Sequence, residues 1–382
     1  MLNNIYYFNN AATTWPKPQE VVTAVTDYFV LPPINSARHC NCVKQNEDVD
    51  VVVKRKIAEF FNIDRDKYSI AMTGGATYSA NTFVYWLQKQ NKDIRLITDN
   101  NGHNSIYRTH FEKIGTDPII LDNWDELETL SEEDLKNSYI AITHENNVSG
   151  DLISDETLDK IFNYSRQYNI PIIIDITQSA GTYEIDVKKF NYDNLYIMCS
   201  GHKGLMSVTG IGFLVFPKDK IDIPFISGGT GGVSGIDYKN TGSLEAGTPN
   251  ELAMSSLIAG LDYITSKKIK TIKLYKEMLV EYFLSNYNLV NPKFKENFEL
   301  IPITNPSSGI ISFKLLNNST CVHIIEKLTK DFHIMFRTGV HCAPLYHINV
   351  LKCESTLRLS FGYFNKVHEI DYLIRSINQI LI

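Results

Sequence analysis

The stretch PIIID (residues 171–175), followed by LYIMCSGHKG (residues 195–204), decides the fold class of this chain. Each stretch holds a short apolar run that ends on a polar or glycine residue, and a longer amphipathic segment lies between them. Apolar runs of this length, alternating with helical patterns, are typical of parallel strands joined by crossover helices. We therefore predict an α/β fold built around these two strands.

The same alternation extends outward, from about residue 57 to residue 216. It predicts a mostly parallel, doubly wound sheet, and such sheets bind ligands at the carboxyl ends of their strands. The predicted strands are residues 68–72, 94–98, 118–121, 139–143, 171–175, 195–199 and 212–216. The helices predicted between them are residues 77–90, 105–114 and 154–168.

Two segments rich in Gly, Thr and Ser, residues 228–235 and 241–249, interrupt this pattern, and one long helical run follows over residues 250–286. We place a domain boundary inside that helix. The predicted parts are an N-terminal segment (1–20) that packs on the small domain and active site, a large domain (21–260) and a small α+β domain (261–382). The elements predicted in the small domain are strands 308–314, 334–337 and 355–360 and helices 321–330 and 366–380.

Composition excludes several classes of protein. The 382 residues carry 37 Lys and Arg against 43 Asp and Glu, so nucleic acid is not an expected partner. No apolar run approaches the roughly 18 residues that cross a bilayer, so we expect no membrane partner. Residues 1–8 lack a secretory signal, which predicts a cytoplasmic protein with free thiols. The six cysteines are irregularly spaced, so no metal site is expected, even where Cys40 and Cys42 lie close together.

Two residues of the deciding stretches combine into a chemical site. Asp175 ends the strand PIIID, and Lys203 follows the next strand within SGHKG. Pyridoxal phosphate needs both residue types: a lysine for a Schiff base with its aldehyde, and a carboxylate that keeps its pyridine nitrogen protonated. Taken alone, Asp175 also fits a strand-end cap and Lys203 a solvated charge. Their joint position at one edge of the sheet favours a pyridoxal-phosphate site.

Other groups suited to this cofactor lie nearby in the predicted fold. Residues 73–77 (TGGAT) join a strand to a helix, where backbone N–H groups and the helix dipole would hold a phosphate. His103 has a flat ring that can stack on a pyridine, although a hydrogen-bonded core histidine is the ordinary alternative. Further candidates are Ser200 and His202 toward the phosphate, and Asn147 and Gln178 toward the ring hydroxyl.

Ten short motifs, in order along nearly the whole chain, carry a family resemblance. The chain resembles the cysteine desulfurases, within the fold type I, class V aminotransferase group of pyridoxal-phosphate enzymes. No single motif is specific, but the ordered set is. The motifs are YFNNAATT (7–14), TGGATYSAN (73–81), GHNS (102–105), NNVSG (146–150), DITQSAG (175–181), SGHKG (200–204), GGTG (228–231), EAGTPN (245–250), RTGVHCAP (337–344) and RLSFGYFN (358–365).

The resemblance implies roles for the cofactor site. Lys203 would form the covalent bond to pyridoxal phosphate, Asp175 would contact its ring nitrogen, and His103 would stack on the ring and move protons. In this family a threonine of the neighbouring subunit often completes the phosphate site, which assigns that role to Thr230 and implies a homodimer. The cofactor-binding residues so implied are Gly75, Ala76, Thr77, His103, Asn147, Asp175, Gln178, Ser200, His202, Lys203 and Thr230.

Cys342 distinguishes between activities of the family. Its motif RTGVHCAP resembles the subgroup with a short cysteine loop, which includes selenocysteine lyases, and implies a nucleophilic thiol; a buried structural thiol is the alternative. The chemistry needs a thiolate, so we expect His341 and Arg337 to lower the pKa of Cys342. Arg358 is expected to bind the substrate carboxylate through two parallel hydrogen bonds, with a surface salt bridge as its alternative. Substrate contacts by family analogy are Asn10, Ala11, Arg337 and Arg358.

The function implied is conversion of L-cysteine to L-alanine, with a persulfide on Cys342 whose sulfur passes to an acceptor protein. L-selenocysteine is the other substrate that the subgroup allows. Two alternatives stay open. One is a class V aminotransferase or another pyridoxal-phosphate lyase (a selenocysteine lyase or a cysteine/cystine C–S lyase) in which Cys342 is not nucleophilic, and the other is a binding protein without activity. A nucleotide site is poorly supported, because residues 228–235 lack the ending of a P-loop.

Four positions depart from the family pattern. Asn9 stands where Asp is usual, Gly102 where Glu is usual, and Leu244 where Arg is usual. Residues 207–208, Ser and Val, replace a common Gly-Pro step. None of these departures removes a cofactor contact, but they leave the substrate and the acceptor open.

Overall fold

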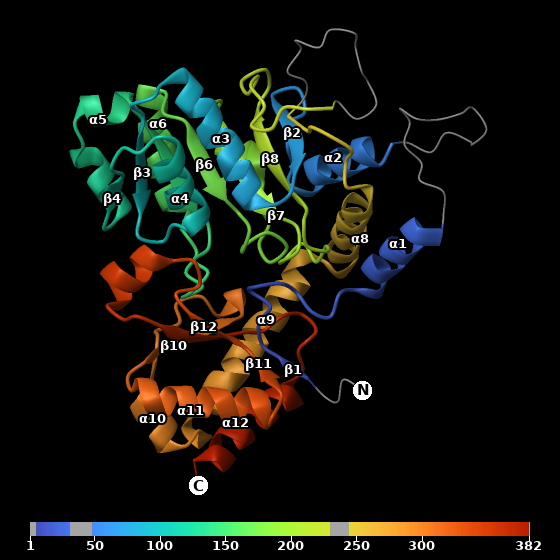
Figure 1. The fold of residues 1–382 in the computed structure, drawn as a ribbon, viewed down its shortest axis with the longest axis vertical. Coiled ribbons are helices and arrows are strands. Elements are labelled where there is room, and N and C mark those ends of the chain that lie inside the picture. The colour runs from blue at the N-terminus through green and yellow to red at the C-terminus, as the bar shows by residue number, and fades with distance from the viewer. Residues whose placement is uncertain (1–4, 31–47, 230–243, 382) are drawn as a thin grey trace.

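A computed structural model describes residues 5–30, 48–229 and 244–381 of the chain (Figure 1). It contains a large unit around a seven-stranded sheet and a smaller unit around a four-stranded sheet, joined by a long helical connection. None of the helices in these three ranges is both long and apolar enough to cross a membrane.

The large sheet has the predicted class and all seven predicted strands, with ends that differ by at most one residue. Only β8 runs antiparallel to its neighbours β2 and β7, and the other neighbouring pairs are parallel. The prediction of a mostly parallel sheet is confirmed. In sheet order, the strands are β2 (Tyr68–Thr73), β8 (Gly212–Pro217), β7 (Leu195–Ser200), β6 (Ile172–Asp175), β5 (Ser138–Thr143), β3 (Arg95–Asp99) and β4 (Ile119–Leu121).

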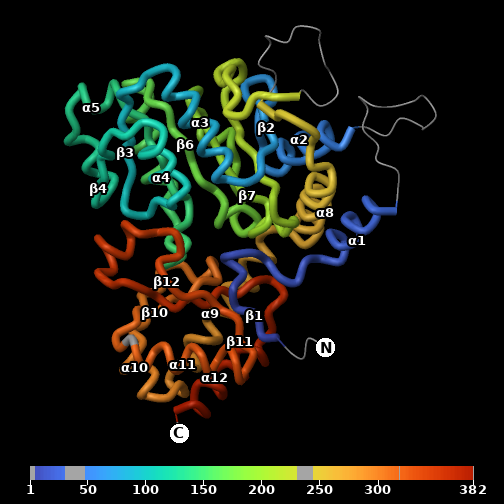
Figure 2. Tube along the Cα trace, viewed as in Figure 1, coloured from blue at the N-terminus to red at the C-terminus, as the bar shows by residue number. Residues whose placement is uncertain are grey.

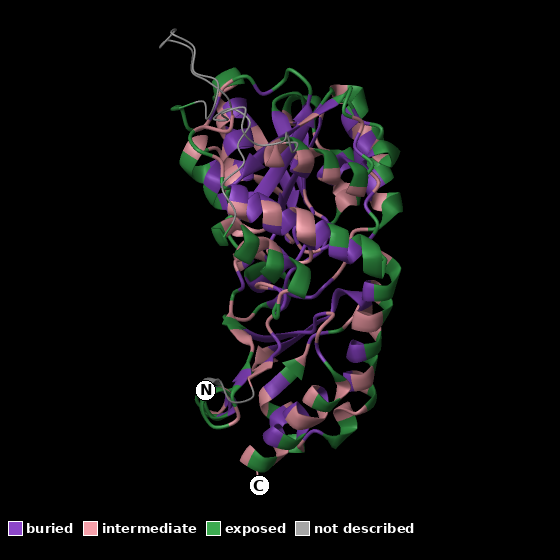
Figure 3. Cartoon of the chain, turned by 90° about the vertical axis from the view of Figure 1, so that its right-hand side faces the viewer, coloured by how far each residue is buried: buried purple, intermediate pink, exposed green. Residues whose placement is uncertain are grey.

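Both faces of this sheet are covered, because successive strand residues point to opposite sides. Tyr139 and Ala141 pack in one buried cluster with side chains of α3 (Ala76–Gln90) and α4 (Asn104–Lys113). Ile140 and Ile142 belong to the other cluster, with side chains of α2 (Val49–Phe60), α6 (Asp155–Tyr168) and α8 (Glu251–Lys267). Figure 3 shows the buried strands between helices whose outer sides are exposed. The sheet is therefore doubly wound.

Shorter helices of this unit are Trp124–Thr129 (3₁₀), α5 (Glu132–Lys136) and α7 (Val187–Phe190).

The single long helix expected after residue 250 is two helices, α8 (Glu251–Lys267) and α9 (Ile269–Ser285). The chain turns at Lys268, whose φ of 67° lies in the left-handed region. Neither glycine nor proline marks this break in the sequence. The boundary predicted after residue 260 falls within α8, whose apolar side chains pack against the large sheet as far as Ile264.

The small unit has an antiparallel sheet in the order β12 (Arg337–Gly339), β13 (Thr356–Ser360), β10 (Ile310–Leu315), β9 (Phe298–Leu300). Its core includes side chains of α9, α11 (Asn318–Lys330) and α12 (Val367–Ile380). The single strand expected over residues 334–337 is wrong, because Phe336 separates β11 (Ile334–Met335) from β12 and the two join different sheets. Short helices here are Tyr287–Leu289 and Pro306–Ser308 (3₁₀), α10 (Pro292–Asn297) and a π-helical turn, Tyr346–Leu351.

The N-terminal segment connects the two units (Figure 2). β1 (Tyr6–Tyr7) pairs with β11, and Phe8 enters the small core. The Thr14 N–H then donates to the His202 carbonyl of the large unit at 3.2 Å, and α1 (Gln19–Val30) packs on α8. The N-terminal segment therefore contacts both the small unit and the loop that follows β7.

Candidate active site

The predicted cofactor residues gather at the carboxyl edge of the large sheet. His103 follows β3, Asn147 follows β5, Gln178 follows β6, and Lys203 follows β7. Asp175 ends β6, where it pairs in register with the neighbouring strands β5 and β7. Since these four strands are parallel, their carboxyl ends share one edge, and the structure brings all five residues to it.

Lys203 sits in a tightly packed loop beside Asp175. Its neighbour Gly204 lies so close to the Ala180 carbonyl oxygen that a Cβ at this position would overlap it, which fixes the loop against the segment after β6. Burial lowers the pKa of the Lys203 amine to about 8, as does the charge of Arg358, while the Asp175 carboxylate opposes them. The amine is therefore partly unprotonated near neutral pH, as a nucleophile or base must be.

The start of α3 offers an anion-binding site. Gly75, with a φ of 137° that disfavours any other residue, precedes the helix and provides no side-chain cap. The Ala76 N–H donates to the Ser200 hydroxyl at 2.9 Å, and Thr77 is exposed in the first turn. Helix N-termini bind phosphate through the N–H groups of their first turn, and these four residues lie at such an N-terminus.

His202 is held next to this site by the N-terminal segment. Its carbonyl accepts hydrogen bonds from the Thr14 N–H at 3.2 Å and from the Lys17 ammonium at 3.0 Å. Burial, with the charges of Lys203 and Lys17, lowers the pKa of the His202 imidazole to about 4, so the ring is neutral. Its Nδ1 finds no partner among the described residues. Sequence reasoning missed the anchoring by Thr14 and Lys17, although both lie in or beside the motif YFNNAATT.

Two amides predicted to face the cofactor ring connect the rim to other parts of the chain. The Gln178 side chain donates to the Ala11 carbonyl at 3.0 Å. The Asn147 side chain donates to the His341 carbonyl at 2.6 Å, while its Oδ1 has no partner among the described residues. Both the N-terminal segment and the small unit therefore meet the rim of the large sheet.

Arg358 is a fully buried guanidinium, with an exposed fraction of 0%. Its Nη1 donates to the Asn147 carbonyl at 2.6 Å, but Nε and Nη2 have no partner within the described part of the chain. Burial, and then the charge of Arg337, lowers the pKa of Arg358 to about 9. Asn10, also buried, donates to the carbonyl of Ser360 in the same strand as Arg358. Unpaired buried donors require an explanation, and a bound carboxylate would supply the missing acceptors.

Cys342 lies between groups of both units. The Arg337 Nη2 donates to its Sγ at 3.6 Å, and a hydrogen bond from His103 is the largest cause of a pKa lowered to about 6; burial opposes this shift. The expectation that His341 supplies positive charge is wrong. That ring is buried against the Thr356 carbonyl, and burial holds its pKa far below the usual range. His103, assigned beforehand to the cofactor ring and to proton movement, supplies a hydrogen bond to the thiol, and Arg337 contacts it as expected.

The backbone of the cysteine loop is held in a strained conformation. His341 and Cys342 have φ angles of 49° and 60°, and two adjacent residues other than glycine rarely share the left-handed region. The Cys342 carbonyl accepts a hydrogen bond from the Asn104 N–H at 2.8 Å, which ties the loop to the start of α4. Such strain persists only where the surroundings hold it, and it concentrates at functional sites.

Some sequence predictions lie elsewhere or cannot be placed. Thr230 and the Cys40 and Cys42 pair fall outside the described residues. Cys199 and Cys321 are buried free thiols, and Cys353 is partly buried. One departure from the family pattern has a local reason: a Cβ at Gly102 would overlap the ring of Tyr107.

Comparison with known proteins agrees with this geometry. Residues 5–373 match the family model "Aminotransferase class-V". A probable cysteine desulfurase of Pyrococcus abyssi is 28% identical over 100% of this chain and 95% of its own length, and one of Borreliella burgdorferi is 27% identical over 99% and 92%. Among solved structures, a cysteine desulfurase of Thermococcus onnurineus superimposes with a TM-score of 0.78 at 25% identity, over 99% of this chain and 95% of that one.

The cysteine desulfurase CsdA of Escherichia coli superimposes with a TM-score of 0.80 at 22% identity, over 99% of this chain and 94% of that one. This likeness supports the fold, a fold type I arrangement of a large and a small unit. The family model covers both units and every predicted site motif. The chain belongs to the aminotransferase class-V family.

Proposed function

We propose that this protein is a pyridoxal-phosphate-dependent cysteine desulfurase, which converts L-cysteine to L-alanine and takes the sulfur onto Cys342. One observation carries the proposal: a thiol with a pKa lowered to about 6 lies between Arg337 and His103, at the same rim as Lys203. An aminotransferase has no use for an activated thiol at this place. The cysteine desulfurases among the relatives add support.

The described residues are suited to the cofactor. The Lys203 amine with a pKa of about 8 is ready to bond an aldehyde, and Asp175 supplies a carboxylate beside it. The open start of α3 and Ser200 supply donors for a phosphate. When bound, pyridoxal phosphate acts as an electron sink that weakens the bonds at the α-carbon of an amino acid.

Arg358 orients the substrate. Its unpaired Nε and Nη2 form two donors for the α-carboxylate of L-cysteine, in a pocket that also holds Asn10 and Asn147. A buried guanidinium fixes a carboxylate in one orientation. Lys203, freed when the substrate takes its place, is the base that takes the α-proton and later returns a proton to the product.

Cys342 performs the sulfur transfer. At neutral pH it is largely a thiolate, held by Arg337 and His103. The thiolate attacks the substrate sulfur, so that an S–S bond forms and the substrate Cβ–S bond breaks. The electron pair of the broken bond stays on the carbon skeleton, which gains a proton and leaves as alanine. The extra sulfur remains on Cys342 as a persulfide.

The proposal has three further parts. The persulfide passes its sulfur to an acceptor protein, since Cys342 must be regenerated for another turnover. The enzyme acts as a homodimer whose second subunit contributes Thr230 to the phosphate site. It works in a reducing compartment, the cytoplasm, in which the free thiols of Cys199, Cys321, Cys342 and Cys353 persist.

Mass spectrometry tests the proposal directly. After brief exposure of the holoenzyme to L-cysteine, without reductant, the peptide that contains Cys342 should gain the mass of one sulfur atom, and alanine should appear in equal amount. A control replaces Cys342 by Ala, which should prevent both. Release of pyruvate and sulfide with no sulfur on Cys342 would instead indicate a C–S lyase, and amino transfer to a keto acid would indicate an aminotransferase.

A further inference from the structure

Thr356 of β13 is bound to the loop that carries Cys342, and the proposed chemistry leaves this contact unused. The cysteine loop (residues 340–343) follows β12, and Thr356 lies against it with an exposed fraction of 0%. The Thr356 carbonyl accepts a hydrogen bond from the His341 Nε2 at 3.3 Å. The Thr356 hydroxyl lies 3.0 Å from the Nε2 of His347. Thr356 therefore contacts two histidines, one within the loop and one just after it.

His347 connects Thr356 to the cysteine loop from the π-helical turn, Tyr346–Leu351. Its ring is buried, and its Nδ1 lies 2.9 Å from the Ala343 carbonyl. Since a carbonyl only accepts, Nδ1 carries a hydrogen. Burial lowers the pKa of His347, so the ring is neutral and its Nε2 accepts from the Thr356 hydroxyl. One chain of hydrogen bonds therefore runs from Thr356 through His347 to Ala343, the residue after Cys342.

These hydrogen bonds hold the strained part of the loop on both sides of the thiol. His341 and Cys342 have φ angles of 49° and 60°, which residues with side chains keep only where their surroundings fix them. The Thr356 carbonyl holds His341 through its ring. His347 holds the carbonyl of Ala343, on the other side of Cys342. The pair of Thr356 and His347 therefore fixes the backbone from which the thiol projects.

The same strand carries Arg358, which the proposed function assigns to the substrate carboxylate. Thr356 and Arg358 are two residues apart in β13, so their side chains lie on the same face of the strand. Arg358 donates to the Asn147 carbonyl at 2.6 Å, and the Asn147 side chain donates to the His341 carbonyl at 2.6 Å. The cysteine loop and the proposed carboxylate site are therefore both fastened to β13, which sets their relative position.

We propose that Thr356 and His347 are positioning residues that hold the Cys342 thiolate at the place from which it attacks the substrate sulfur. The inference deepens the proposed function and rests on it, since attack by Cys342 and carboxylate binding by Arg358 are parts of that function. Both residues act through the cysteine loop. A displacement of about 1 Å at a reacting group can slow a reaction by about 100-fold, so these hydrogen bonds bear on the rate of sulfur transfer and not on carboxylate binding.

Kinetics of the holoenzyme test this division. Thr356→Val replaces the hydroxyl by a methyl group of similar size and leaves the His347 Nε2 without its donor. It should lower kcat for alanine release from L-cysteine by about 10-fold or more, with a change in KM below about 2-fold, because Arg358 is untouched. Thr356→Ser keeps the hydroxyl and should keep nearly full kcat. His347→Phe should lower kcat as Thr356→Val does, and the double variant should be no slower than either single variant, because the two residues act through one chain.

The thiol itself gives a second measurement that needs no turnover. The low pKa of Cys342 depends on its contacts with His103 and Arg337, so a displaced loop weakens them. Without L-cysteine, iodoacetamide alkylates the protein over a range of pH, and the Cys342 peptide is quantified by mass spectrometry. Thr356→Val should raise the midpoint of alkylation by about half a pH unit or more, toward that of an ordinary thiol. Thr356→Ser should leave it unchanged.

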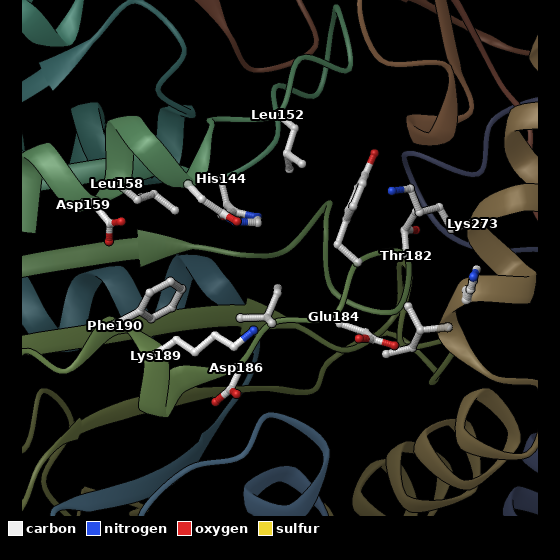
Figure 4. A pocket seen from close by; sticks show the side chains of 15 residues that line it. His144, Leu152, Leu158, Asp159, Thr182, Glu184, Asp186, Lys189, Phe190 and Lys273 are labelled. Carbon is white, nitrogen blue, oxygen red and sulfur yellow. The ribbon is translucent and has the colours of Figure 1, made fainter.

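Two buried histidines away from the cysteine loop are matched controls. His110 lies between a hydroxyl and a carbonyl, those of Tyr139 at 3.1 Å and Thr116 at 2.8 Å, as His347 does. His144 lines a cavity of about 580 Å³ between α6, α7 and the start of α9, and no residue of the cysteine loop lines that cavity (Figure 4). His110→Phe and His144→Phe should leave kcat and the midpoint of Cys342 alkylation unchanged.

Unchanged kcat and midpoint in Thr356→Val and His347→Phe would overturn the inference, as would equal losses in Thr356→Val and Thr356→Ser or in the control variants. The outcome can be told apart from failure of the proposed function. Alanine release by the wild type, with kcat and midpoint unmoved in the variants, would leave the desulfurase intact and refute the role of the pair. A raised midpoint in Thr356→Val, in a protein whose wild type releases no alanine, would refute the desulfurase and support the hold of the pair on the thiol.

Discussion

Two free cysteines at the same rim show how environment decides reactivity. Cys199, in β7, is fully buried, and burial raises the pKa of its thiol well above the usual value; the Asp175 carboxylate adds to this effect. Its Sγ donates to the Ser200 carbonyl at 3.6 Å. Cys342 has a pKa lowered to about 6 and is only partly buried. At neutral pH, one cysteine is a packed thiol and the other a thiolate.

The difference arises from where each residue lies in the fold. Cys199 sits within one unit, and its neighbours are apolar residues of the sheet core. Cys342 sits where the two units meet, with Arg337 from the small unit and His103 from the large one. Its low pKa therefore depends on both units being in place. A reactive thiol at such a junction is lost when either unit moves, whereas a core thiol is not affected.

Replacing each of the two cysteines by alanine gives the largest expected difference in activity. Cys342→Ala should reduce alanine release from L-cysteine by at least about 10³-fold, because the sulfur acceptor is gone. Cys199→Ala, the matched control at the same rim, should retain nearly full activity. Both rates are measured as alanine formed per holoenzyme, with cofactor content checked by absorbance. Equal losses in the two variants would mean that Cys342 has no special role.

Arg358 tests whether the reactive thiol also needs an oriented substrate. Arg358→Lys keeps a positive charge but removes the pair of unpartnered donors, and it should raise the KM for L-cysteine by about 10- to 100-fold. Kinetics with L-cysteine would measure the change. Arg375→Lys on the exposed side of α12 is the control and should leave KM unchanged. An unaltered KM in Arg358→Lys would assign the carboxylate to another residue.

Arg337 tests the cause of the low pKa. Arg337→Met removes the donor to Sγ, and the pKa of Cys342 should rise by about one unit, toward that of an ordinary thiol. The measurement is the pH midpoint of iodoacetamide alkylation on the Cys342 peptide. Cys353, whose pKa burial raises, is read in the same digest as an internal reference and should not move.

Arg337→Lys restores a charge and should recover part of the shift. A midpoint that does not move in Arg337→Met would leave the hydrogen bond from His103 as the whole cause of the low pKa of Cys342.

Periodicity and motif order predicted the large sheet and its cofactor rim, because each strand there is a short apolar run with a polar residue at its end. The same reasoning missed the break at Lys268 and the change of sheet between β11 and β12. Tertiary packing produces both features, and no turn residue marks either of them in the sequence. It also expected His341, the neighbour of Cys342 in sequence, to act beside Arg337 in lowering the pKa of the thiol. Arg337 does so, but the other group is His103, more than two hundred residues away in sequence, and only the folded chain brings it to Cys342.

The smallest expected effect is on the free energy of unfolding. Which of the two Cys→Ala variants loses more of it depends on pH. At pH 6, Cys199→Ala should lower the free energy of unfolding by about 1 kcal/mol, because it leaves a small core cavity, while Cys342→Ala changes little. A thiol with a lowered pKa in the fold stabilises it above the unfolded pKa of about 8.5, and this contribution is lost as pH falls through 6. A thiol whose pKa is raised by folding destabilises the fold at high pH, because there the thiol ionises only in the unfolded chain.

At pH 9, therefore, Cys342→Ala should become the less stable variant relative to wild type, by under about 1 kcal/mol because the thiolate is partly exposed to water. Cys199→Ala should lose less stability than at pH 6. Urea unfolding of both variants and the wild type at the two pH values measures this crossing. If the ranking stayed the same at both values, the two thiols would titrate alike in the folded chain, and the contrast between the sheet core and the junction of the two units would be wrong.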